Sequence, residues 1–365
     1  MLRRTITSPR LFRSSHQDPG SLGKFIRRLE VSIPLGCTRV AHETFDLSID
    51  RREVELQEQD LTEIINVLRD SARLEIFAVT ITSLEIPEAS LGRILAALSA
   101  TLETLLWYSP FSWLEVGDPL FERMWLEFFD NHPLLATIDT PYSEFDLPSS
   151  PSLRHVPWPS VRHWSVRVDF AAPLPSERLR NLETLSFLQA LDGTMPSFTD
   201  FVEDFCTFVS VQGRRLTSIT LVLSQGPLPI SALVEVLETV KSGCPLLRQI
   251  QFLLSPLAAQ SDYYPLDIEE IPASVQLPTV RMLGLGFSSL DIPMLENLGV
   301  IEWYHALMLP WRKLFPKLEV LRLLLEADVE GLRTHGIYLK KVVKSCSGAS
   351  LVLEDNFGRA LTEDG

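Results

Sequence analysis

A short pattern of apolar positions, L-x-x-L-x-L, recurs along the chain. In the second half of this pattern apolar residues alternate with polar or small ones, as expected for a short strand that buries one face. Only Thr140 departs from a large apolar residue among the thirty template positions. The pattern is matched by ten segments: IRRLEV (26–31), LEIFAV (74–79), LETLLW (102–107), LATIDT (135–140), VRHWSV (161–166), LETLSF (182–187), LTSITL (216–221), LRQIQF (247–252), VRMLGL (280–285) and LEVLRL (318–323).

The stretches between these segments include helical patterns. Apolar residues follow i, i+3, i+4, i+7 spacing, or most of it, in residues 91–98, 198–208 and 233–240. A strand followed by a helix, repeated about every thirty residues, cannot bury its apolar faces alone and has to stack on its neighbours. The pattern predicts an α/β fold: a leucine-rich-repeat-like solenoid with a curved parallel sheet on the concave side and helices on the convex side.

A doubly wound or barrel α/β enzyme also alternates strands with helices. Its parallel strands are buried on both faces and read as continuous apolar runs. Here the slot after the first apolar residue is mostly polar, which favours a sheet with one solvated face. In chain order that slot holds Arg27, Glu75, Glu103, Ala136, Arg162, Glu183, Thr217, Arg248, Arg281 and Glu319.

Composition narrows the classes of function. The 365-residue chain is 45% hydrophobic, typical of a globular protein, and its formal net charge of −14 argues against nucleic-acid binding. Its four cysteines form no C-x-x-C pair, so neither a zinc site nor a disulfide framework is indicated. The longest apolar stretch contains Arg93 and Glu103, so no membrane span is expected.

Motifs for catalysis are absent from the sequence. It has no G-x-S-x-G, H-E-x-x-H or P-loop, and LGLGFSS (283–289) lacks the third glycine of a dinucleotide fingerprint. The histidines His155 and His163 lie near Trp158 and Trp164 without the cysteine or acidic partner of a metal site. We therefore expect no catalytic residue, no metal and no cofactor.

Several segments carry a family resemblance. FPKLEVLRLLLE, LPTVRMLGLGF, RNLETLSF and CPLLRQIQFLL resemble the irregular leucine-rich repeats of fungal F-box proteins, and the likeness covers most of residues 23–355. LRRTITSPRLF is similar to the segment that joins the F-box to the first repeat strand in that family. The resemblance implies the substrate-recognition region of a ubiquitin-ligase receptor. Skp adaptor and cullin are implied partners if an F-box lies upstream, since residues 1–22 do not supply one.

The chain is expected to divide into three parts. Residues 1–22 form a basic linker or remnant, residues 23–355 an array of about ten repeats, and residues 356–365 a C-terminal tail. The first fifteen residues are rich in Arg and Ser, which is also typical of a mitochondrial transit peptide, but Pro9 interrupts a helix there. A cytoplasmic or nuclear location is favoured over a mitochondrial one.

Two sets of residues are candidates for protein binding. The segments after the strands combine aromatics with acids and prolines, and in a parallel solenoid they would meet along one edge as an acidic, aromatic rim. The alternative is that these rings plug the ends of the repeat core. The rim candidates are Trp113, Tyr142, Phe145, Tyr263 and Tyr264. A second set points outward from the template strands: Tyr108, Asp139, Ser165, Arg167, Gln251 and Arg322.

These observations predict a non-enzymatic scaffold that binds another protein of unspecified identity. An α/β enzyme with a divergent site and an adaptor-free structural repeat protein remain as alternatives.

Overall fold

The computed structural model contains two compact units, which are described separately. One comprises Met1–Ser165 with Glu177–Asn181, and the other Val166–Ser176 with Leu182–Gly365. The structure describes residues 4–6, 26–33, 51–81, 88–108, 127–139, 160–167, 179–188, 198–223, 229–254, 268, 271–287 and 306–363.

The first unit is built on parallel strands that pair in chain order. Helix α2 (Arg51–Asp70) connects β2 to β3, helix α3 (Glu88–Ala97) connects β3 to β4, and the two helices pack on each other. The strands are β1 (Arg4–Ile6), β2 (Arg28–Ile33), β3 (Ile76–Ile81), β4 (Thr104–Tyr108), β5 (Thr137–Asp139) and the start of β6 (His163–Arg167). Strand β1 lies within the segment interpreted from sequence as a linker.

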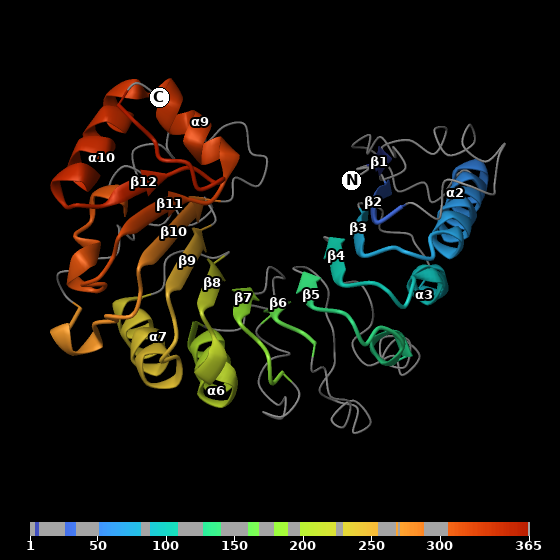
Figure 1. Cartoon of the computed structure of the whole chain (residues 1–365), viewed down its shortest axis with the longest axis horizontal. Helices are drawn as coiled ribbons and strands as arrows, with labels where there is room; N and C mark the ends of the chain where they lie inside the picture. Colours follow the sequence, from blue (N-terminus) through green and yellow to red (C-terminus); the bar gives the residue numbers. More distant parts are fainter. Residues whose placement is uncertain are drawn as a thin grey trace, which may run out of the picture. The chain divides into compact units, whose positions relative to one another are not determined.

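The second unit repeats this plan. Its parallel strands, again paired in chain order, are β7 (Thr184–Leu188), β8 (Ser218–Leu223), β9 (Gln249–Leu254), β10 (Met282–Phe287), β11 (Val320–Leu323) and β12 (Val352–Glu354). Its helices are α6 (Phe198–Gln212), α7 (Ile230–Gly243), α9 (Glu326–Thr334) and α10 (Gly336–Gly348). Short 3-10 turns are η3 (Gly213–Arg215), η6 (Ala273–Val275) and η8 (Trp311–Lys313). Figure 1 shows α6 and α7 side by side, and the two helices are in contact.

The fold class is therefore α/β with a parallel sheet, as predicted. Among the described strands the sheet is open and does not close into a barrel. Within each unit, each strand is hydrogen-bonded to its neighbours in sequence, so the connections carry the chain forward without crossing back.

The middle apolar residue of the template forms a buried row across each unit. In the second unit Leu185 pairs with Ile219, Ile219 with Ile250, and the row continues through Leu283 and Leu321. All of these side chains are fully buried. The first unit has the same row: Leu29, Phe77, Leu105, Ile138 and Trp164. The middle template positions are thus confirmed, and Leu353 of β12 extends the row by one strand that the ten segments did not include.

The polar slot after the first template residue lies immediately before each of the ten strands β2 to β11. All ten residues of this slot are exposed or half-buried. Their backbones form a ladder, in which one carbonyl accepts N–H groups from two consecutive residues of the next strand. The oxygen of Arg248, for example, accepts from Arg281 and Met282 at 2.8 and 3.1 Å. An ion pair joins Arg281 to Glu319 along the same column.

The helices cover the apolar face through the residues that the spacing predicted. In α6, Phe201, Phe205 and Phe208 surround Phe187 of β7, with ring centroids 5.7, 5.2 and 6.1 Å from the Phe187 centroid. The contacts of Phe201 and Phe205 with Phe187 are edge-to-face, which adds to the stabilisation that burial of the rings provides. In α7 the buried face is Leu233, Val236, Leu237 and Val240.

A tight turn precedes most strands and has the same hydrogen bond each time. The N–H of the first template residue bonds to the carbonyl three residues earlier, as from Leu216 to Gly213 at 2.9 Å and from Leu247 to Cys244 at 3.2 Å. Successive turns pack so closely that a Cβ on Gly213 would lie 2.8 Å from Cys244 Sγ and 2.9 Å from the Gly243 carbonyl. This stacking supports the register of the strands that follow.

Replacing Leu185 by Asp should unfold the second unit, because an unpaired charge would enter the buried row. We expect a loss of more than about 4 kcal/mol in urea denaturation. Thr184→Asp is the matched control, since Thr184 is half-buried on the opposite face of the same strand. Equal denaturation midpoints for the two variants would contradict the assignment of the core face.

Gly213→Ala should destabilise the second unit by about 1 to 3 kcal/mol, because the new methyl group meets backbone and a buried sulfur. In Gly331→Ala, a Cβ meets nothing within 4 Å in helix α9, and the better helix propensity of alanine should raise stability by up to about 1 kcal/mol. Thermal unfolding of both variants checks the pair. The two variants should shift the melting temperature in opposite directions. A Gly213→Ala variant that is more stable than the native chain would contradict the close stacking of the turns.

Candidate binding surface

The second unit carries a row of outward-facing residues beside its buried row. Each follows the middle template residue by one position, so its side chain points to the other face of the sheet. The row runs in register across the unit as Ser186, Thr220, Gln251, Gly284, Arg322 and Glu354. We call it the outward row. Its side chains supply two hydroxyls and an amide on β7 to β9, and a guanidinium and a carboxylate on β11 and β12, with Gly284 between the two groups on β10.

Polar contacts order the first part of the outward row. The Thr220 hydroxyl donates to Gln251 Oε1 at 2.9 Å. This bond occupies the amide oxygen, and the amide nitrogen of Gln251 has no partner among the described residues. Thr220 is buried whereas Gln251 is half-buried. Gln251 is therefore held in place with two N–H donors available to a ligand.

Glycines in β10 allow neighbouring side chains to lean across the strand. A Cβ on Gly284 would lie 2.7 Å from Leu324 Cδ2 and 2.8 Å from Gln251 Cγ, and one on Gly286 would lie 2.5 Å from Leu253 Cδ2. Both glycines are buried under these side chains. The LGLG sequence thus serves packing on the outward face, in line with its structural interpretation from sequence.

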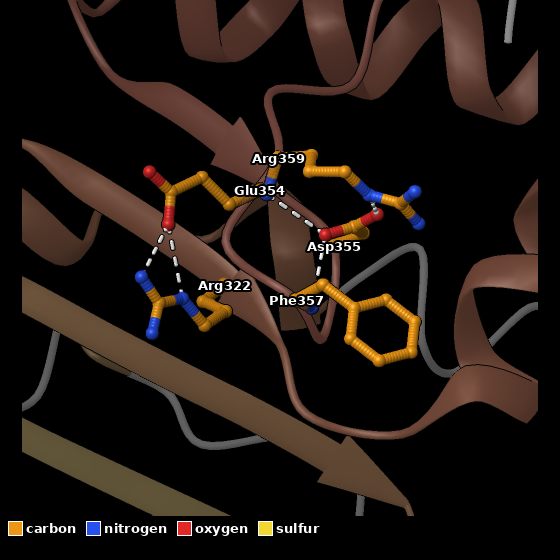
Figure 2. Close-up of polar contacts among 5 residues, drawn as sticks. All are labelled: Arg322, Glu354, Asp355, Phe357 and Arg359. Carbon is orange, nitrogen blue, oxygen red and sulfur yellow. Dashed lines mark hydrogen bonds and ion pairs between the residues drawn. The ribbon is translucent and has the colours of Figure 1, made fainter. Parts of the chain in front are cut away.

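An arginine and a glutamate end the outward row. Arg322 donates from Nε and Nη2 to one oxygen of Glu354, Oε2, at 2.9 and 2.6 Å (Figure 2). Both side chains are partly buried, which reduces the screening of the pair by solvent. Arg322 Nη1 and Glu354 Oε1 take no part in this pair.

A tight turn follows Glu354 directly and covers the edge of β12. We call residues 355–359 the terminal turn. Asp355 occupies the third template position, where the other strands of this unit bury an apolar residue, and it is also buried. Its Oδ1 accepts N–H groups from Phe357 and Arg359 at 2.9 and 2.8 Å, and its Oδ2 accepts from Arg359 Nε at 2.7 Å (Figure 2).

The chain then returns along β12. Leu361 N–H donates to the Leu353 carbonyl at 2.8 Å, and Glu354 forms an antiparallel bridge with Ala360. Gly358 has φ of +77°, a conformation that favours glycine. A Cβ there would lie 3.2 Å from Arg322 Nη2. The terminal turn therefore lies against the Arg322–Glu354 pair.

An exposed aromatic ring stands on this turn. Phe357 is 67% exposed, although its backbone N–H is fixed by Asp355. The guanidinium carbon of Arg359 lies 5.0 Å from the centre of the Phe357 ring, within range of a cation–π interaction. Ring and guanidinium are thus presented together from a hydrogen-bonded backbone.

The charge state of Asp355 is set by opposing effects. Burial alone would raise the pKa of this carboxyl, but the N–H groups of Arg359 and Phe357 and the Arg359 guanidinium together lower the pKa below its ordinary value. Asp355 is therefore a carboxylate at neutral pH and holds the terminal turn in its ionised form.

Thiol and metal chemistry receive no support from the described residues. Burial raises the pKa of Cys244 to about 12 and that of Cys346 to about 11, and the pKa of Cys206 is also raised by burial. These thiols stay protonated near neutral pH and are poor nucleophiles. In the same part of the chain, no three His, Cys, Asp or Glu side chains gather as a metal ion would require. None of the described helices is long and apolar enough to cross a membrane.

The predicted binding residues have different outcomes. Gln251 and Arg322 lie on the outward row of the second unit. Asp139 is half-buried on β5 of the first unit, where it pairs in register with Ser165. Tyr108 and Arg167 lie in strands β4 and β6, where the structure describes their backbone but not their side chains. The rim candidates Trp113, Tyr142, Phe145, Tyr263 and Tyr264 all fall outside the described residues.

Sequence reasoning did not find Glu354, Phe357 or Arg359. The signal that could have found them is VLEDNFG (352–358), where an acid takes the third template position and a turn-forming glycine follows. No family model matches the chain, and no curated protein is significantly similar to it. A functional assignment therefore rests on the described surface and the sequence pattern.

Acid should open the terminal turn. The lowered pKa of Asp355 means that its stabilising contribution is complete above the unfolded pKa of about 3.9. That contribution is lost as pH falls through the still lower folded-state pKa. Hydrogen exchange of Phe357 and Arg359 amides, referenced to their intrinsic rates, should show protection that falls below about pH 4. Asp355→Asn should abolish that pH dependence. Unchanged protection down to pH 2 in the native chain would contradict the role of the carboxylate.

Proposed function

We propose that this chain is a non-enzymatic protein-binding scaffold of the leucine-rich-repeat-like solenoid type. Its parallel sheet forms the concave side and its helices the convex side. The outward row of the second unit contacts the protein ligand. The observation that carries the proposal is the register of that row, which aligns polar groups of different chemistry on β7, β8, β9, β11 and β12, with Gly284 between them on β10.

The repeat architecture is supported by the way the strands are joined. A doubly wound sheet reverses its strand order at the point where ligands bind. Within each unit the strand order follows the chain, as in an array whose repeats contact only their neighbours. The repeated turn before each strand, with its hydrogen bond across three residues, fits the same interpretation.

A binding role is supported by the chemistry of the outward row. Its polar groups are held by mutual contacts, such as the Thr220–Gln251 bond, and so lose little conformational freedom when a ligand binds. Scaffolds of this kind use the sheet face as an extended binding surface. The resemblance to fungal F-box proteins would make the ligand a ubiquitin-ligase substrate, with Skp adaptor and cullin as further partners if an F-box lies upstream.

The experiment compares two isosteric changes. Gln251→Glu keeps an acceptor for the Thr220 hydroxyl but replaces the free amide donors with a negative charge. Gln276→Glu makes the same change at a half-buried residue after η6, outside the outward row. Proteins that bind the full chain in its native cells are quantified by mass spectrometry. We expect a specific set to be depleted about tenfold by Gln251→Glu and left unchanged by Gln276→Glu. Equal recovery with both variants would reject the outward row as the binding surface.

A further inference from the structure

The terminal turn and the end of the outward row present guanidinium donors that the contacts described above leave unused. Arg359 uses Nε to hold Asp355, and its two terminal nitrogens have no hydrogen-bond partner among the described residues. Arg322 likewise keeps Nη1 after pairing with Glu354. The same segment also holds side-chain acceptors, Glu354 Oε1 and the amide oxygen of Asn356. A ligand that pairs with the guanidinium nitrogens has to bring acceptors of its own.

Two features distinguish these donors from an ordinary surface arginine. Arg359 is anchored through Nε and its backbone N–H to a buried carboxylate, so its outer edge is oriented before a ligand arrives. It is 67% exposed as a side chain, and the equally exposed Phe357 ring lies beside it. Rigid pairs of an aromatic ring and an arginine are the composition that binding hot spots favour.

The geometry also selects the shape of the acceptor. The terminal nitrogens of a guanidinium lie in one plane and match the two oxygens of a carboxylate. Phe357 provides an apolar face next to that plane. A carboxylate alone would leave the ring exposed, and an apolar group alone would leave the guanidinium unpaired.

We propose that the terminal turn is the anchor point for an acidic peptide segment of the protein ligand. The side-chain carboxylate of an Asp or Glu in that segment binds the terminal nitrogens of Arg359, and an adjacent aromatic or large apolar side chain packs on Phe357. This inference rests on the proposed function, because it names the class of partner segment that the outward row receives at its β12 end.

A basic and apolar surface elsewhere in the same unit provides the control. On helix α10, Ile337 is 73% exposed and shares a face with the exposed lysines Lys341 and Lys344. This face offers positive charge and an apolar group, but on the helix exterior and without the buried carboxylate that orients Arg359. Nonspecific attraction of an acidic peptide to the protein would use it as readily as the terminal turn.

The test uses an array of immobilised ten-residue peptides and the full chain as probe. The array contains peptides with a central Glu-Phe pair, and the same peptides with Gln-Phe or Glu-Ser. We expect retention of the Glu-Phe peptides to exceed that of both altered sets by about tenfold. Phe357→Ala should reduce retention about tenfold, and Ile337→Ala should change it less than about twofold. Phe357→Ala leaves the backbone N–H that Asp355 holds, so the turn should stay folded.

Three results would overturn the proposal. The first is equal retention of Glu-Phe and Gln-Phe peptides, the second is absence of retention, and the third is full retention by Phe357→Ala. The Gln251→Glu variant separates this failure from that of the proposed function. If cellular partners are lost with Gln251→Glu but kept with Phe357→Ala, the outward row binds protein and the anchor is wrong. If neither variant affects those partners, the proposed function fails as well.

Discussion

The register of one buried residue per strand determines the rest of each unit. From Leu185 to Leu353 the second unit places a fully buried aliphatic side chain at the same height on every strand. A shift by one residue would turn that side chain toward the other face, so burial fixes the pairing. Once the pairing is fixed, the neighbouring positions also align, which places the outward row on one line across the sheet.

The last strand of the second unit departs from the apolar template at one position. At the third template position Asp355 replaces the apolar residue, and its buried carboxylate has to find donors. Those donors come from the backbone of Phe357 and Arg359, which bends the chain into the terminal turn and returns it along β12. The free edge of β12 is thereby paired, and an open strand edge is a liability in any parallel sheet.

The sequence predicted the repeated strands well because a strand with one buried face has apolar residues at alternating positions. The middle template residues and the helix faces of α6 and α7 all appear where periodicity placed them. It predicted neither β12 nor the terminal turn, since Ser350 and Asp355 break the template at its first and third positions. Contacts such as Arg322 with Glu354 join side chains 32 residues apart on successive strands, and no local pattern encodes them. The predicted aromatic rim stays a prediction.

The central claim is that the ligand lies on the outward row and not on the helices. A photoreactive amino acid placed at position 186, in the outward row on β7, or at position 238, on the exposed side of α7, tests this directly in native cells. The account predicts that a protein crosslinks efficiently from position 186 and that Phe357→Ala or a change at Arg322 weakens this crosslink. A partner that crosslinks from position 238 and not from position 186 would contradict it.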